Sequence, residues 1–190
     1  MVTVNTSGHR IHKMATKQEN LHLQIAHFKQ FMKYIPGFNQ MDASTVYELL
    51  SLGLIEVSTA FETAIANKSG TEVISQDHAD LSCGSDAKLS SVRTASYGTV
   101  YSAPVTGIHN KTGDLLVQVY ERKQDKFYYF RLPYISYCHI PRSSNIEIPF
   151  ELDGTPRRHN KKQNNPWLHE CESFTDMCGV DSLVDNCIEL

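Results

Sequence analysis

Two acidic residues and a lysine lie close together in the segment 79–91, ADLSCGSDAKLSS. Asp80 precedes Asp86 and Lys88, and the intervening Cys83-Gly84-Ser85 is typical of a turn. Two carboxylates held near a strand end suit a hard divalent cation such as Mg²⁺, which prefers oxygen ligands and keeps several waters. A lysine two residues beyond Asp86 on a strand points to the same side. There it can position or help to deprotonate a water and stabilise charge at phosphorus, so these residues predict phosphodiester hydrolysis.

The pattern Asp80…Asp86-Ala87-Lys88 resembles the PD-(D/E)xK signature of the nuclease superfamily that includes type II restriction endonucleases and homing-type endonucleases. Ala79 stands where that signature has a proline. The resemblance implies that Asp80 and Asp86 ligate Mg²⁺, for which Mn²⁺ can substitute, with the Ala87 carbonyl as a further ligand. It also implies that Lys88 acts on the attacking water.

In that superfamily a helix supplies an upstream acid, which here is Glu62 or Glu56. Both flank the apolar face of the same predicted helix, and we favour Glu62 because it is nearer to the acid pair in sequence. Its role would be to support a second metal or to orient Lys88. Asp77 competes with Asp80, since the two have opposite parity on a regular strand and only one can face the site.

Two amphipathic helices are expected before these acids. The segment 17–35 repeats apolar residues at steps of four and three and stops at Pro36-Gly37. Asp42 is a suitable N-cap for a second helix over 43–67, which Gly53 weakens or divides.

Strands are expected after the helices. The segments 71–82 and 86–94 are two candidate strands, and 95–113 is an irregular crossover without an obvious helix. The strongest β signal is a hairpin whose strands, LLVQVYE and KFYYFRL, flank a polar turn at 122–125. The aromatic residues 128–130 are assigned to the core.

This order predicts an α/β (α+β) fold. By resemblance it is a restriction-endonuclease-like core with a central mixed β-sheet of about four or five strands, flanked by helices. The chain of 190 residues is expected to form a single nuclease domain. Its core covers about 42–134, and a basic DNA-contact loop and C-terminal helical segment occupy 141–190.

A basic run late in the chain is the candidate DNA-binding loop. The formal net charge is −3, so positive charge for a nucleic acid must be local. Lysine and arginine hold phosphates, and asparagine can read base edges. The predicted contacts are Arg93, Arg157, Arg158, His159, Asn160, Lys161 and Lys162. Additional phosphate contacts near the sheet are Arg93, His109, Lys111, Lys123 and Lys126.

These residues together predict a Mg²⁺-dependent, site-specific endonuclease that acts on double-stranded DNA. Cutting both strands requires two active sites or sequential nicks, so a homodimer is expected. The first twenty residues lack the apolar region of a secretory signal, and no stretch is apolar enough to cross a bilayer. We therefore expect a cytoplasmic protein that is neither secreted nor membrane-bound.

Two alternatives use other residues. A non-catalytic nucleic-acid-binding module would keep the basic loop without a working site. A zinc-organised protein would use Cys138-His139, the triplet 169–171 and Cys178, although their spacing matches no compact zinc-ribbon pattern. His159-Asn160 together with His169 weakly matches a His-Asn-His (HNH-type) nuclease motif.

Overall fold

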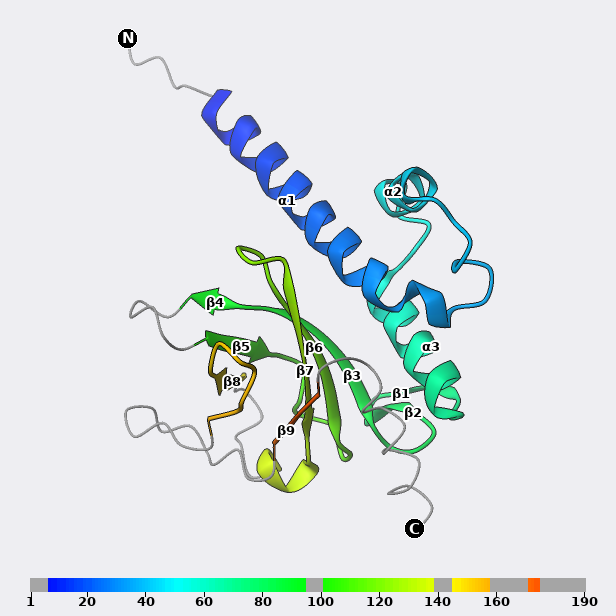
Figure 1. The fold of residues 1–190 in the computed structure, drawn as a ribbon, viewed down its shortest axis with the longest axis vertical. Coiled ribbons are helices and arrows are strands. Elements are labelled where there is room, and N and C mark those ends of the chain that lie inside the picture. Colours follow the sequence, from blue (N-terminus) through cyan, green and yellow to red (C-terminus); the bar gives the residue numbers. More distant parts are fainter. Residues whose placement is uncertain (1–6, 95–100, 139–144, 158–170, 175–190) are drawn as a thin grey trace.

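The structure is a computed structural model, and it describes residues 7–94, 101–138, 145–157 and 171–174. It has a mixed α/β fold in which helices come first and strands follow (Figure 1). No helix in this part of the chain is long and apolar enough to cross a membrane.

The helical part consists of α1 (Ser7–Phe31), the short 3₁₀ helix η1 (Met32–Tyr34), α2 (Ala43–Ser51) and α3 (Val57–Ser69). The long first helix and the break after it were predicted from the apolar repeat. The expected second helix is two helices, α2 and α3.

Local capping explains these boundaries. The Asp42 side chain accepts hydrogen bonds from the N–H groups of Ser44 and Thr45, each at 2.9 Å, which confirms it as the N-cap of α2. Gly53 has a φ of +69°, a left-handed conformation that suits glycine and ends the first of the two helices. Gly70 adopts a φ of +72° and closes α3 in the same way.

The strands follow in chain order, with a second 3₁₀ helix between β7 and β8: β1 (Val73–Gln76), β2 (Ala79–Leu81), β3 (Asp86–Ser91), β4 (Arg93–Thr94), β5 (Tyr101–Val105), β6 (Leu115–Glu121), β7 (Lys126–Leu132), η2 (Tyr134–Ser136), β8 (Ile146–Phe150) and β9 (Glu172–Phe174).

The described strands form three sheets. A four-stranded mixed sheet has the order β3-β6-β7-β9, with β3 parallel to β6 and the other pairs antiparallel. β4, β5 and β8 form an antiparallel sheet of three strands, and β1 and β2 form a separate pair. β3 is therefore an edge strand of the main sheet, and the first acid-bearing strand, β2, belongs to another sheet.

The helices lie on one face of the main sheet, and β5 and β8 lie on the other (Figure 1). A hydrophobic core fills each of these two interfaces. On one face, α1 and α3 pack through Phe28, Phe31 and Ile65. On the other face, β5 and β8 pack against the alternate residues of β6 and β7. β6 shows this alternation, since Leu116 belongs to the helical core and Val117 to the opposite one. The site strand β3 thus lies in the middle layer of three.

Several predicted strands need correction. The segment 71–82 is not one strand but the hairpin β1–β2, because the polar pair Asp77-His78 forms a turn between them. The crossover 95–113 contains β5, which pairs with β4 and β8. Residues 172–174 form β9 rather than the start of a C-terminal helix, and the rest of that predicted helical segment lies outside the described residues.

The predicted hairpin of β6 and β7 is confirmed, with its antiparallel register running from Leu115 opposite Leu132 to Glu121 opposite Lys126. The aromatic residues 128–130 are buried, as expected of core residues.

Candidate active site

The turn between β2 and β3 brings the two acids together. Gly84 has a φ of +86° and donates its N–H to the Leu81 carbonyl at 2.8 Å. The Ser85 carbonyl accepts from the N–H groups of Asp80 and Leu81, at 3.1 and 3.0 Å. Asp86 then begins β3. The chain thus reverses tightly, as the sequence predicted, although β2 and β3 do not pair as a ladder in the described structure.

Backbone contacts fix both acids. The N–H of Asp86 donates to the Asp114 carbonyl at 2.9 Å, where β3 begins its parallel pairing with β6. The N–H of Ala87 donates to Oδ2 of Asp80 at 3.1 Å. This bond holds the Asp80 carboxylate against the start of β3.

Lys88 lies on the same side of β3 as Asp86, as expected for residues two apart on a strand. Its Nζ is 2.5 Å from Oδ2 of Asp86. Asp86 is fully buried, whereas the Lys88 side chain remains 22% exposed. Lys88 therefore faces both the carboxylate and solvent.

A second lysine, which the sequence suggested only as a phosphate contact, completes the cluster. Nζ of Lys111 lies 3.2 Å from Oδ1 of Asp80 and also forms a short ion pair with Oδ1 of Asp86. The two Asp86 oxygens are paired with the ammonium groups of Lys88 and Lys111, which therefore provide the main compensation of this buried charge. No sequence pattern indicated that Lys111 would meet the acids.

Proximity moves the pKa values of the two acids apart. Burial and the hydrogen bond with Asp80 raise the pKa of Asp86 to about 6, although both lysines oppose the shift. Burial also acts to raise the pKa of Asp80, but its hydrogen bonds with Asp86 and the Ala87 N–H, together with Lys111, lower it. Two carboxyl groups in contact behave in this way because both cannot easily be ionised at once.

The charges of this acid pair affect the pKa of Glu62, the favoured candidate for the upstream acid. Burial, followed by the charges of Asp80 and Asp86, raises the pKa of Glu62 to about 7. Glu62 lies on α3, which packs against β3, and it makes no hydrogen bond or ion pair with the acids among the described contacts.

Glu56 has a different place. Its side chain caps α3 by accepting from the N–H groups of Ser58 and Thr59, at 3.4 and 2.6 Å. The structure therefore separates the two candidates: Glu62 is coupled to the acid pair and Glu56 is a helix cap. Asp77, the competitor of Asp80, is exposed in the turn between β1 and β2.

A tyrosine near the acids was not singled out from the sequence as part of the site. Tyr137 is buried and donates its hydroxyl to the Gly113 carbonyl in a short hydrogen bond. Burial and the charges of Asp86 and Asp114 raise its pKa well above the usual range. Tyr137 therefore stays protonated and braces the segment that carries Lys111.

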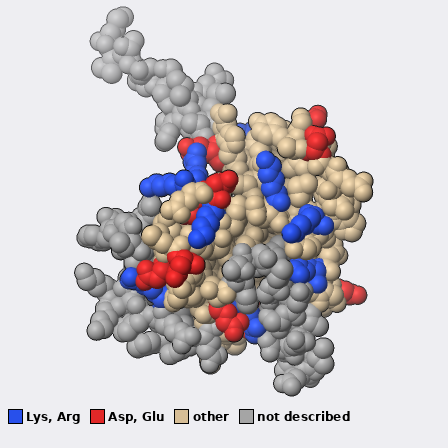
Figure 2. Space-filling view, in the orientation of Figure 1, with Lys and Arg blue, Asp and Glu red and all other residues tan. Residues whose placement is uncertain are grey.

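The predicted DNA contacts are only partly described. Arg93 is exposed on β4, with an Nη1 3.7 Å from Oε1 of Glu147. Arg157 forms a short ion pair with Glu151. The remaining predicted contacts, 158–162, lie outside the described residues. On the face drawn in Figure 2, basic and acidic side chains are interspersed among neutral ones.

The described residues contain no group of three or more His, Cys, Asp and Glu side chains arranged to hold a metal, so they provide no support for the zinc-organised alternative. Cys138 is exposed and Cys171 is buried against the second core. His139, Cys178 and the HNH-type residues 159, 160 and 169 lie outside the described part.

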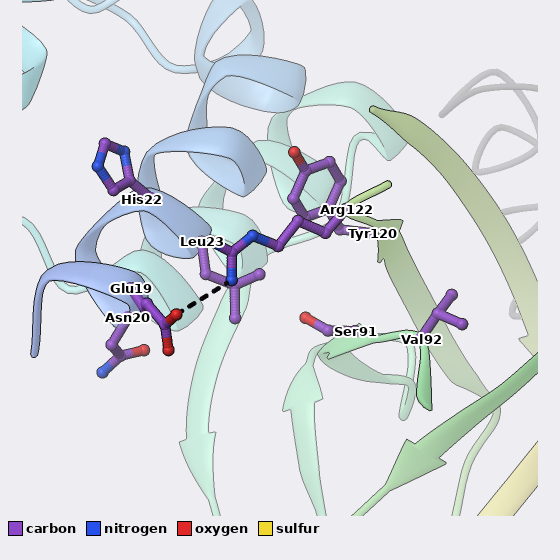
Figure 3. A pocket seen from close by; sticks show the side chains of 8 residues that line it. All are labelled: Glu19, Asn20, His22, Leu23, Ser91, Val92, Tyr120 and Arg122. Atoms are coloured by element: carbon purple, nitrogen blue, oxygen red, sulfur yellow. Dashed lines mark ion pairs between the residues drawn. The ribbon is translucent and has the colours of Figure 1, made fainter. Parts of the chain in front are cut away.

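The acids do not line the hollows between α1 and the sheet. One, of about 370 Å³, is lined by Ser91 and Tyr120, which pair at the opposite end of the β3–β6 ladder from Asp86. Figure 3 shows the ion pair of Glu19 with Arg122, at 3.6 Å, across this hollow. A second hollow of about 480 Å³ includes Glu56 and also lies toward the end of β3. The acid–lysine cluster instead lies where β3 begins, at the edge of the sheet.

Two carboxylates with a cation already between them make a chemically suitable site for a hard divalent metal. Mg²⁺ is commonly held by one or two carboxylates and keeps its waters, so the absence of a third protein carboxylate from the described cluster is compatible with it.

Comparison of the chain with protein families, with curated proteins and with solved structures found no match.

Proposed function

We propose that this protein is a divalent-metal-dependent nuclease that hydrolyses phosphodiester bonds in double-stranded DNA. The observation that carries the proposal is the convergence of Asp80, Asp86 and Lys88 at the start of an edge strand. The order of the elements supports it, because α3 precedes the acid pair and carries Glu62, whose pKa is raised by burial and by the charges of Asp80 and Asp86. The PD-(D/E)xK resemblance and a restriction-endonuclease-like core belong to the same proposal.

The residues fit a metal on chemical grounds. Both Asp86 oxygens are buried and paired with ammonium groups, and the Lys111 ammonium lies between the two acids, where a metal cation would bind. Asp80, Asp86 and the Ala87 carbonyl would hold Mg²⁺, or Mn²⁺ in its place. When bound, the metal supplies Lewis-acid stabilisation of charge at phosphorus and lowers the pKa of a bound water.

The chain's own groups then have distinct tasks. Lys88, which is partly exposed and paired with Asp86, would position the attacking water or help to deprotonate it. Glu62, with its raised pKa, would support a second metal, orient Lys88 or exchange a proton near pH 7. Arg93 and the basic segment 157–162 would hold DNA phosphates. A homodimer would provide the two sites needed for a double-strand cut.

The test is cleavage of supercoiled plasmid and of linear duplex DNA with Mg²⁺, with EDTA as the blank. Wild-type protein should nick or linearise the plasmid, and Lys88→Ala and Asp86→Asn should lower the rate by at least about 100-fold, the usual scale for acid–base and metal-ligand groups. Lys29→Ala is the matched control, because Lys29 is exposed on α1 and is not one of the predicted DNA contacts. It should cut as wild type does.

Equal cleavage rates for wild type and Lys88→Ala would refute the assignment of this catalytic centre. DNA binding without any metal-dependent cutting would instead favour the non-catalytic binding module. The double variant Arg157→Ala, Arg158→Ala should weaken binding and reduce the log–log salt slope by about one unit for each phosphate that the arginines no longer neutralise.

A further inference from the structure

Lys111 occupies the position between the two acids. Its ammonium group contacts Oδ1 of both Asp80 and Asp86, and its side chain is only 11% exposed. Most lysines keep this group in water. An ammonium group this well covered, in contact with two carboxylates, is part of the site rather than a surface charge.

The backbone around Lys111 is tied to the segments that carry the acids. The N–H of Thr112 donates to the His78 carbonyl at 3.3 Å, next to β2. The Asp114 carbonyl accepts from the N–H of Asp86 at 2.9 Å. Thr112 and Asp114 follow Lys111 closely in sequence, so these two bonds join the Lys111 segment to the segments that carry both acids.

Gly113 adds a steric constraint. A Cβ at this position would lie 1.8 Å from the Gly84 carbonyl oxygen, so the backbone approaches the β2–β3 turn more closely than any side chain would allow. Tyr137 holds the same residue from the other side through its hydroxyl. The segment is therefore docked on the turn that places Asp80 and Asp86.

A divalent cation and the Lys111 ammonium need the same oxygens. A metal held by Asp80 and Asp86 would also carry two positive charges close to Lys88 and Lys111, and like charges at such distances repel strongly outside bulk water. The two cations therefore compete for this pair of carboxylates, and a metal bound there would displace the Lys111 ammonium from Oδ1 of Asp80 and Asp86.

From this competition, and resting on the nuclease function proposed above, we propose that Lys111 is an internal counter-ion that is exchanged for the divalent cation. In the metal-free protein it compensates the acid pair. When the metal binds, the released ammonium needs a new anion, and a phosphate oxygen of the DNA supplies one. Metal binding and DNA binding then strengthen each other, by the same factor in both directions.

The first experiment measures Mn²⁺ binding at pH 7.5 without DNA, from the free-ion signal in electron paramagnetic resonance. The proteins are wild type, Lys111→Met, Asp86→Asn and the charge-matched control Lys29→Met. Lys111→Met should bind Mn²⁺ at least about tenfold more tightly than wild type, since a competing charge is gone. Lys29→Met, at an exposed position of α1, should match wild type, and Asp86→Asn should lose the site.

The outcomes separate the two proposals. Mn²⁺ binding that is lost in Asp86→Asn but equal in wild type and Lys111→Met would overturn the counter-ion role and leave the nuclease proposal standing. No Mn²⁺ binding in any of the proteins would overturn both.

Coupling to DNA is tested with Ca²⁺ and a short duplex by calorimetry, so that binding is measured without turnover. The duplex should tighten Ca²⁺ binding in wild type by a larger factor than in Lys111→Met. Equal factors would overturn the transfer of Lys111 to phosphate.

A measurement on wild-type protein removes any dependence on the folding of the variant. Acetylation of lysine amines is followed by mass spectrometry, with and without saturating Mn²⁺. Lys111 should react at least about threefold faster in the presence of the metal, because the released amine is more accessible to the reagent, while the rate at the exposed Lys29 should not change. An unchanged or slower rate at Lys111 would overturn the exchange.

Discussion

Replacing Glu62 by glutamine should stabilise the metal-free protein at pH values above neutrality. Burial and the charges of Asp80 and Asp86 raise the pKa of Glu62 to about 7, from an ordinary value of 4.5. A carboxyl group whose pKa is raised by folding favours the native state below its unfolded pKa, and this contribution is lost as pH rises through the folded value. Glutamine does not titrate, so the variant escapes this loss.

The size of the effect follows from the two pKa values. The difference between 4.5 and about 7 corresponds to roughly 3 kcal/mol, at about 1.4 kcal/mol per unit. Glu62 is only partly buried, so solvent screening reduces this to about 1–2 kcal/mol. The free energy of unfolding of Glu62→Gln, relative to wild type, should therefore rise by this amount between pH 4.5 and pH 8.

The assay is urea denaturation in EDTA at several pH values from 4.5 to 8.5. Glu56→Gln is a control of opposite sign on the same helix. Burial acts to raise the pKa of Glu56, but its cap bonds with Thr59 and Ser58 outweigh burial and lower it. The contribution of Glu56 to the free energy of unfolding is present above its unfolded pKa and is lost as pH falls through its folded pKa. At pH 8, Glu56→Gln should therefore be less stable than wild type.

A Glu62→Gln variant whose stability relative to wild type does not change with pH would refute the coupling of this residue to the acid pair. A decrease at pH 8 would refute it as well. Saturating Mg²⁺ should shrink the advantage of the variant, because a bound cation offsets the repulsion that Glu62 experiences.

Three further predictions concern the scaffold. Burial lowers the pKa of His27 to about 4, so this residue should contribute a loss of roughly 3 kcal/mol of stability as pH falls from 7 to 4. His27→Gln, which keeps a partner for Gln118, should lack this contribution and lose less stability than wild type over that range in urea denaturation. Arg131→Met should cost about 1–3 kcal/mol in the same assay, because it removes the 2.8 Å ion pair that compensates the half-buried Asp114. Gly113→Ala should cost at least about 1–3 kcal/mol and lower the melting temperature, since the added methyl group collides with a backbone carbonyl.

Local signals explain what the sequence predicted correctly. The Asp42 cap, the division at Gly53 and the β6–β7 hairpin each depend on residues within a few positions of one another. The alternation on β3 that joins Asp86 to Lys88 is also local. Such features follow from propensity and periodicity without knowledge of the tertiary fold.

The remaining features depend on partners distant in sequence. Asp80 and Lys111 are 31 positions apart, and no periodicity relates them. The role of Glu56 was also hidden, since N-caps are usually Ser, Thr, Asp or Asn rather than Glu. The strand β5 lies in a segment whose pairing with β8 is set by packing against the main sheet.

The parallel pairing of β3 with β6 also bears on the order of folding. Asp86 begins β3 opposite Leu115, and a parallel neighbour this far along the chain requires closure of a long loop. The β2–β3 turn, by contrast, can form within microseconds, as hairpins do. We therefore expect Asp80 and Asp86 to face each other early in folding, before the Lys111 segment has docked, so that their repulsion opposes the compact state. Added salt screens such repulsion, so refolding should be faster at moderate ionic strength than in dilute buffer.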